Sequence, residues 1–148
     1  MHIGIAVDGS EHALQALRTS IELARKVAAP VELCLIHVSF DSLASPVARE
    51  IDRHQVAEYL DQLAQADLQA AIELVAASGI AFRVIKAHGE VVPTLLSTIA
   101  NEHLDLIVVG SKGRGGLADL LIGSVANRLT QLSPVPVVVV PKSTTRGA

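Results

Sequence analysis

The chain has very few aromatic side chains: no Trp, one Tyr and two Phe among 148 residues. Proteins that bind single-stranded nucleic acid stack successive bases on such side chains. The formal net charge is −3, so no basic field exists to attract a phosphate backbone either. We therefore expect no nucleic-acid partner.

Cysteine pairs and long apolar runs are also missing. Cys34 is the single cysteine, so it cannot form an internal disulfide, and we interpret it as a small apolar residue of a strand in a reducing compartment. No apolar run approaches the ~18 residues that a membrane span needs. The first ten residues, MHIGIAVDGS, have no basic segment and too short an apolar stretch for a signal peptide. We expect a cytoplasmic protein with no membrane partner.

Short apolar runs alternate with longer helical patterns along the chain. The runs that predict strands are Ile3–Val7, Val31–Val38, Ala81–Ala87, Leu104–Val109 and Pro136–Val140. The patterns that predict helices cover Glu11–Val27, Ile51–Ala77, Val91–Asn101 and Ser124–Leu132. Strands that alternate with helices form βαβ units and a parallel sheet. The sequence therefore predicts an open, doubly wound α/β fold with helices on both faces.

The pattern predicts one domain over residues 1–142 and a tail over 143–148, with one long loop at 39–50.

Two polar residues interrupt the predicted core. Asp67 breaks the apolar side of the second helix, and His37 lies inside the second strand. A histidine within an apolar strand is typically buried with its hydrogen bonds satisfied, and no two of the six histidines lie four residues apart on one helix. We therefore expect no metal held by protein ligands.

A glycine-rich segment follows the fourth strand. It holds four of the ten glycines within seven residues: Gly110, Gly113, Gly115 and Gly116. Glycines let backbone N–H groups approach an anion closely. Gly123 and Ser124 then begin a helix, whose N-terminus also favours an anion. The spacing predicts a polyphosphate site that is neither a Walker A loop nor a Rossmann fingerprint, although a flexible loop followed by an ordinary Ser cap stays open on spacing alone.

Asp8 ends the first strand. Its carboxylate could accept hydrogen bonds from both hydroxyls of a ribose, or it could cap the first helix, for which Ser10 is also a candidate. Asp8 and the glycine-rich segment can serve one ligand only if the first and fourth strands are neighbours. That requirement favours the spatial order 3-2-1-4-5, with the ligand at the carboxyl ends of the strands.

The sequence resembles the universal stress protein family over essentially its whole length. The resemblance lies in VDGSEHALQAL at residues 7–17, LIHV at 35–38 and DLIVVGSKGRGGLADLLIGSVANRLTQLSPVPVVVV at 105–140. The ATP-binding branch of that family has the pattern G-x2-G-x9-G-[ST], which is matched here by Gly110, Gly113, Gly123 and Ser124. The resemblance implies a Rossmann-like fold, similar to that of the adenine nucleotide alpha hydrolases, with strand order 3-2-1-4-5.

The resemblance also implies a function and a set of site residues. The protein would bind ATP, or ADP or AMP, with Mg²⁺ accompanying a triphosphate, and would act as a nucleotide-dependent stress-response or signalling module with a partner that the sequence does not name. Asp8 would bind the ribose, Ala6 and Val38 would border the adenine, and Val109 would flank the base or sugar. The residues lining the phosphates would be Gly110, Gly113, Gly123, Ser124 and Val125.

Other functions stay open. Lys112 and Arg114 could supply positive charge for phosphoryl transfer, but spacing fixes no base near the phosphates. We expect slow ATP hydrolysis at most and assign no catalytic residue; His88, at the end of the third strand, has no assigned role. A nucleotide-free interaction module of the same fold is the further alternative. A response-regulator receiver would need a phosphate-accepting Asp after the third strand, where Lys86 and Ala87 precede His88.

The fifth strand would form an edge of the sheet. Val137–Val140 is apolar on both faces and carries no protecting charge. Pro134, Pro136 and Pro141 limit how far pairing can extend, because proline cannot donate to a ladder. The strand could pair with its own copy about a two-fold axis, and the family resemblance also points to a homodimer. The alternative is that the tail Lys142–Ala148 covers this edge.

Overall fold

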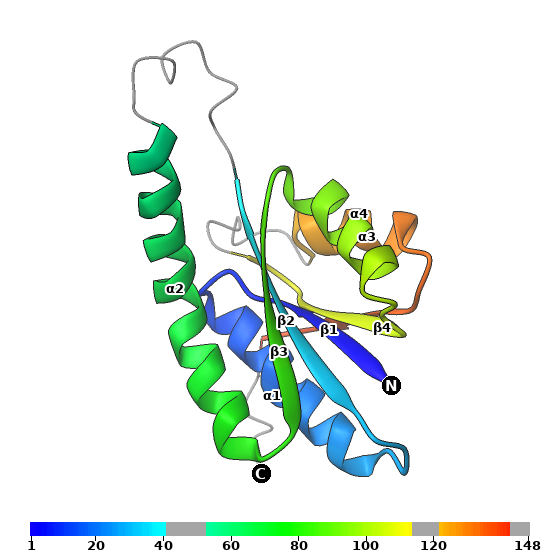
Figure 1. Ribbon diagram of the computed structural model, residues 1–148. Helices are drawn as coiled ribbons and strands as arrows, with labels where there is room; N and C mark the ends of the chain where they lie inside the picture. Colours follow the sequence, from blue (N-terminus) through cyan, green and yellow to red (C-terminus); the bar gives the residue numbers. More distant parts are fainter. Residues whose placement is uncertain (41–52, 114–121, 143–148) are drawn as a thin grey trace.

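The computed structural model describes residues 1–40, 53–113 and 122–142. These residues form a five-stranded parallel sheet with helices on both faces (Figure 1). The elements in chain order are β1 (His2–Ala6), α1 (Glu11–Lys26), β2 (Glu32–Ser39), α2 (Arg53–Ser78), β3 (Ala81–His88), α3 (Val91–Asn101), β4 (Leu106–Gly110), α4 (Ser124–Leu132) and β5 (Val137–Val140). The strand order is β3-β2-β1-β4-β5, so the predicted fold class and topology are confirmed.

β1 lies at the centre of the sheet between β2 and β4. Ile3 is in register with Leu33 of β2 on one side and with Leu106 of β4 on the other. The fourth strand begins two residues later than the sequence predicts. Asp105 precedes it and engages His2 instead: the carboxylate accepts the His2 N–H at 2.6 Å, and the Asp105 N–H donates to the His2 carbonyl at 2.8 Å.

Local signals account for the helix ends. Ser10 is the N-cap of α1, as expected, and its hydroxyl accepts the Ala13 N–H at 3.2 Å. α2 ends at Ser78, directly before Gly79, which has a φ of 74°. That left-handed conformation suits glycine and stops the helix, as the sequence predicts. The observed bounds of α3 and α4 are also those predicted.

Apolar side chains fill both faces of the sheet. α1 and α2 cover one face and α3 and α4 cover the other (Figure 1). Because successive strand residues point to opposite faces, Leu33 and Leu35 pack toward α1 and α2, whereas Cys34 and Ile36 pack toward α3 and α4. Cys34 is fully buried, as expected, and burial raises the pKa of its thiol above the ordinary value. The two packed layers hold the carboxyl ends of the strands in fixed positions.

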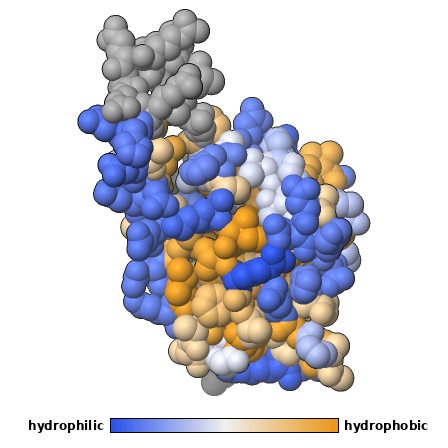
Figure 2. All heavy atoms as spheres, in the orientation of Figure 1, coloured by the Kyte–Doolittle hydropathy of each residue, from blue (hydrophilic) through white to orange (hydrophobic). Residues whose placement is uncertain are grey.

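β3 is the edge strand opposite β5, and much of it is only half-buried. On the face of the molecule drawn in Figure 2, hydrophobic residues lie in the middle, beside the largely hydrophilic outer side of α2.

No helix within the described ranges combines the length and hydropathy that a membrane crossing requires. Part of the predicted long loop (41–50), the start of the predicted second helix (51–52) and the predicted tail (143–148) lie outside the described residues, and the single domain over 1–142 stays a prediction.

Candidate functional site

A cleft of about 370 Å³ opens at the carboxyl ends of β1 and β4, a volume within the range of small-molecule sites. All nine residues that the sequence analysis selects line this one cleft: Ala6, Asp8, Val38, Val109, Gly110, Gly113, Gly123, Ser124 and Val125. The topology brings them together because β1, β2 and β4 are neighbours whose chains all leave the sheet at the same edge. Their role in binding stays a prediction.

One part of the cleft lining is apolar and another is polar. The apolar end is lined by Ala6, Ile36, Val38, Val91, Leu95 and Val109, which belong to or pack against the core cluster between the sheet and α3 and α4. The other apolar lining residues are Val7, Ala13, Val125 and Ala126. The polar lining side chains are Asp8, Ser10, Ser111, Lys112 and Ser124. An arrangement of this kind can hold a flat apolar group at one end and an anion at the other.

The sequence analysis missed the contribution of α3. Val91 and Leu95, one helical turn apart, close the apolar end. Their i, i+4 spacing was visible in the sequence as part of an amphipathic stripe. The stripe alone did not show that α3 packs on the same face of the sheet as α4, which is what makes it a wall of the cleft.

Asp8 is held by the turn between β1 and α1. Its Oδ1 atom accepts the Ser10 N–H at 2.9 Å, while Ser10 itself provides the cap of α1. The alternative role of Asp8 as the helix cap is therefore not the one observed. The Oδ2 atom lies near Gly113, where an added Cβ would come within 2.9 Å of it. The carboxylate therefore lies directly beside the glycine-rich segment.

Gly110 marks a second close approach. A Cβ at this position would lie 2.8 Å from the backbone carbonyl carbon and oxygen of His12, in the first turn of α1. The backbone at the end of β4 therefore lies directly against the first turn of α1. This contact draws the glycine-rich segment against the turn that carries Asp8, and any larger residue at position 110 would push the two apart.

The N-terminus of α4 faces the same space. Gly123 is its N-cap, and because glycine has no side chain it provides no side-chain cap. Ser124, Val125 and Ala126 begin the helix and line the cleft. The first N–H groups of a helix and the positive end of its dipole attract anions. The Gly123 N–H donates to the Ser111 carbonyl, which ties the helix start to the glycine-rich segment.

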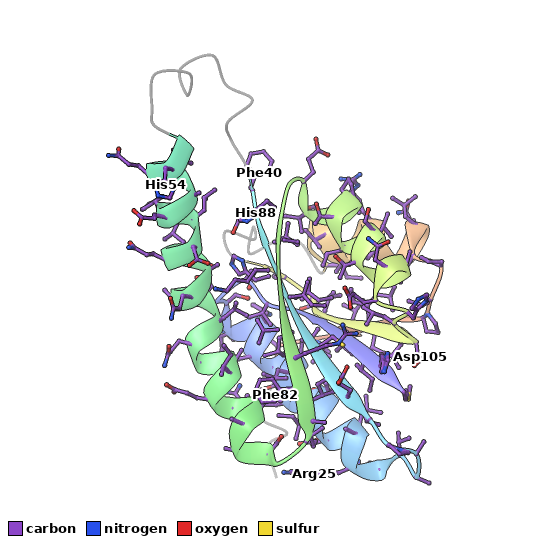
Figure 3. The ribbon with its side chains drawn as sticks, in the orientation of Figure 1. Arg25, Phe40, His54, Phe82, His88 and Asp105 are labelled. Atoms are coloured by element: carbon purple, nitrogen blue, oxygen red, sulfur yellow. The ribbon has the colours of Figure 1, made fainter. Side chains whose placement is uncertain are left out.

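Three residues that the sequence left without a firm role have different positions. Lys112 lines the cleft. His88 lies at the end of β3, in register with Ser39, and is not among the lining residues (Figure 3). Arg114, like Gly115 and Gly116, lies outside the described residues.

Comparison with known proteins identifies the family. A model of the universal stress protein family matches residues 1–141. The chain is also 30% identical over 143 residues to the universal stress protein YxiE of Bacillus subtilis (strain 168), and the match covers 92% of this chain and 95% of that protein. The chain therefore belongs to the universal stress protein family, as the sequence resemblance indicates.

Solved structures support the fold. Hypothetical protein MJ0577 matches with a TM-score of 0.82 at 24% identity, covering 97% of both chains. A universal stress protein family protein from Arabidopsis thaliana, solved with AMP bound, matches with a TM-score of 0.71 at 17% identity, covering 97% of this chain and 93% of that one. At these identities the likeness shows the fold alone.

An added methyl group is expected to have effects of different size at the two glycines. Gly110→Ala places its Cβ 2.8 Å from the His12 backbone, which cannot rotate away, so we expect the free energy of unfolding to fall by about 1–3 kcal/mol. Among the described residues, Gly113→Ala meets the flexible end of the Asp8 side chain at 2.9 Å and nothing else within 4 Å, so we expect a change within about 0.5 kcal/mol. Urea unfolding of both variants measures the difference, and equal losses would contradict this account of the contact between β4 and α1.

Proposed function

We propose that this universal stress protein binds an adenine nucleotide, ATP above all, in the cleft between β1 and β4, and acts in the cytoplasm as a nucleotide-dependent stress-response or signalling module. The observation that carries the proposal is the convergence of Asp8, the glycine pattern and the N-terminus of α4 on one cleft with an apolar far end. The Arabidopsis thaliana relative of the same fold has AMP bound, which supports an adenine nucleotide as the class of ligand.

The polar end suits the phosphates. Backbone N–H groups at Gly113 and at the start of α4 would donate to phosphate oxygens, as helix N-termini commonly do. Lys112 would add a positive charge from the same segment. Asp8 is the single carboxylate among the described residues that line the cleft, so Mg²⁺ would be held chiefly by the phosphates, as this ion usually is.

The apolar end suits the base because of the backbone of Val38. The Val7 N–H donates to the Ile36 carbonyl at 2.8 Å, and the β1–β2 ladder ends there. Alternate residues of a parallel strand direct both their N–H and C=O to the same neighbour, so Val38, two residues after Ile36, directs its own pair to the side where β1 has ended. A neighbouring donor and acceptor complement the N1 acceptor and the N6 amino donor of adenine, while Val91 and Leu95 would cover the ring.

Asp8 would recognise the ribose. Its Oδ1 accepts the Ser10 N–H at 2.9 Å, and each oxygen of a carboxylate can accept more than one hydrogen bond. Two neighbouring hydroxyls of a ribose can donate to the two oxygens of one carboxylate. Asp8 lies two residues after Ala6 of the apolar lining, and its Oδ2 lies beside Gly113 of the glycine-rich segment, so the sugar between the base and the phosphates would lie near it.

Two alternatives have clear tests. A slow ATPase of this fold would release phosphate at a rate that follows the folded fraction and survives further purification. A nucleotide-free interaction module would retain no labelled ATP in equilibrium dialysis. We assign no catalytic residue for hydrolysis, because the spacing of the sequence fixes no general base near the phosphates.

Asp8→Ala tests the ribose assignment. We expect ATP binding to weaken by about 1–3 kcal/mol, because charge-assisted hydrogen bonds from the two hydroxyls are lost. The loss should be much smaller for 2′,3′-dideoxy-ATP, which lacks both hydroxyls. Titration calorimetry with the two ligands measures both effects, and equal losses would mean that Asp8 only supports the turn at the start of α1.

The proposal includes a homodimer through β5. β5 is an edge of the sheet, as predicted, and Val137–Val140 carries no charged residue. The opposite edge strand, β3, carries Arg83 and Lys86, and charges of this kind discourage edge-to-edge pairing. The contrast favours β5 as the strand that pairs with a second copy, antiparallel and about a two-fold axis.

Two variants, each with a lysine at one edge of the sheet, test which edge strand pairs with a second copy. We expect Val139→Lys to shift the protein toward monomer or insolubility, because it places a charge in the pairing edge. Ala81→Lys adds the same charge at an exposed position of β3 and should leave the assembly unchanged. Sedimentation velocity at tens of micromolar measures the state of each protein, and a monomeric unaltered protein would refute the dimer.

A further inference from the structure

Two polar side chains of β2 are buried beneath α2, on the face of the sheet opposite the cleft, next to a partly exposed aspartate of that helix. His37 and Ser39 of β2 are 5% and 6% exposed. The His37 Nε2 atom lies 3.1 Å from Asp67 Oδ2 of α2, and its Nδ1 atom lies 3.4 Å from the Ser39 hydroxyl. Burying polar groups costs free energy even when they are paired, and apolar residues would fill the same space more favourably. A role beyond packing would account for their presence.

The chemistry of the partners defines how the ring is bonded. A carboxylate can only accept a hydrogen bond, so Nε2 carries the proton that Asp67 receives. In the neutral ring Nδ1 is then an acceptor, and the Ser39 hydroxyl donates to it. His37 thereby joins β2 to α2 through one nitrogen and to a later residue of its own strand through the other.

The residues that make these hydrogen bonds, His37 and Ser39, directly precede and follow Val38. Successive strand residues point to opposite faces, so Val38 faces the cleft while His37 and Ser39 face α2. The Ser39 carbonyl also accepts the Gly89 N–H at 3.0 Å, which ties this point of the strand to the end of β3. On the side of β1 the ladder has already ended at Val7. The direction of the Val38 backbone is therefore fixed by contacts from the far face and from β3.

We propose that His37 is a positioning residue for recognition of the base: through Asp67 and Ser39 it holds the Val38 N–H and C=O in the direction that adenine requires. This inference rests on the proposed nucleotide function and adds the residue that gives it selectivity for the base. His37 does not line the cleft and would touch no part of the ligand.

The test compares ATP with inosine triphosphate. The two ligands share the ribose and the triphosphate, but inosine has an oxygen in place of the N6 amino group and a proton on N1, so it opposes the order of donor and acceptor at Val38. We expect the unaltered protein to favour ATP. We expect His37→Leu, which removes both ring hydrogen bonds, to lower the ratio of the two affinities about three- to tenfold, mainly through weaker ATP binding.

A matched pair of variants on α2 supplies the control and covers the case in which His37→Leu does not fold. Asp67→Ala removes the carboxylate partner of His37 and should also lower the ratio. Asp61→Ala removes the carboxylate that pairs with Lys86 at 3.0 Å, a more exposed link between α2 and the sheet, and should leave the ratio unchanged. Circular dichroism and thermal unfolding establish the folded state of each variant before titration.

The outcomes separate the two hypotheses. A lower ratio in His37→Leu or Asp67→Ala, with Asp61→Ala unchanged, supports the positioning role, since a purely structural loss would weaken both ligands alike and preserve the ratio. An unchanged ratio in the folded variants overturns this inference alone. If the unaltered protein bound neither triphosphate, the proposed function would fail and the inference with it.

Discussion

The pairing of β1 with β4 is the constraint on which the site depends. Because these strands are neighbours in a parallel sheet, the turn after β1 and the glycine-rich segment after β4 leave the sheet at the same edge. Asp8 and Gly113 are more than a hundred residues apart in the sequence, and this topology brings them within contact distance. No local interaction could bring them together, so the geometry of the cleft is a consequence of the topology and of the two packed layers that hold it.

Backbone contacts also hold the glycine-rich segment in place. The end of β4 abuts the first turn of α1 at Gly110, and the Gly123 N–H bonds the Ser111 carbonyl, so the glycine-rich segment is held to α1 on one side and to α4 on the other. The result is a cleft bounded by backbone and polar side chains at one end and by aliphatic side chains at the other. Such a division allows strong recognition of phosphates together with selectivity for the base from the edge of a strand.

Much of this was predictable from the sequence, for identifiable reasons. Alternating apolar runs predicted the parallel sheet, and the hypothesis that Asp8 and the glycines share a ligand favoured the strand order that is observed. The predicted start of β4 was two residues too early, because the side chain of Asp105 bonds the backbone of His2, and this long-range contact has no local signal in the sequence. The wall formed by α3 and the partnership of His37 with Asp67 were missed for a related reason: periodicity identifies a buried face, but only packing decides which residue of another element it meets.

Amide chemical shifts of the ¹⁵N-labelled protein during titration with ATP test the central claim most directly. A nucleotide in the cleft between β1 and β4 should move the signals of Val38, Gly113 and Ser124 first and furthest, because these three amides belong to three different walls of one site. Signals at the opposite end of the sheet, such as that of Ala81 at the start of β3, should stay in place. Absence of shifts at saturating ATP, or shifts confined to residues outside the cleft, would contradict the account.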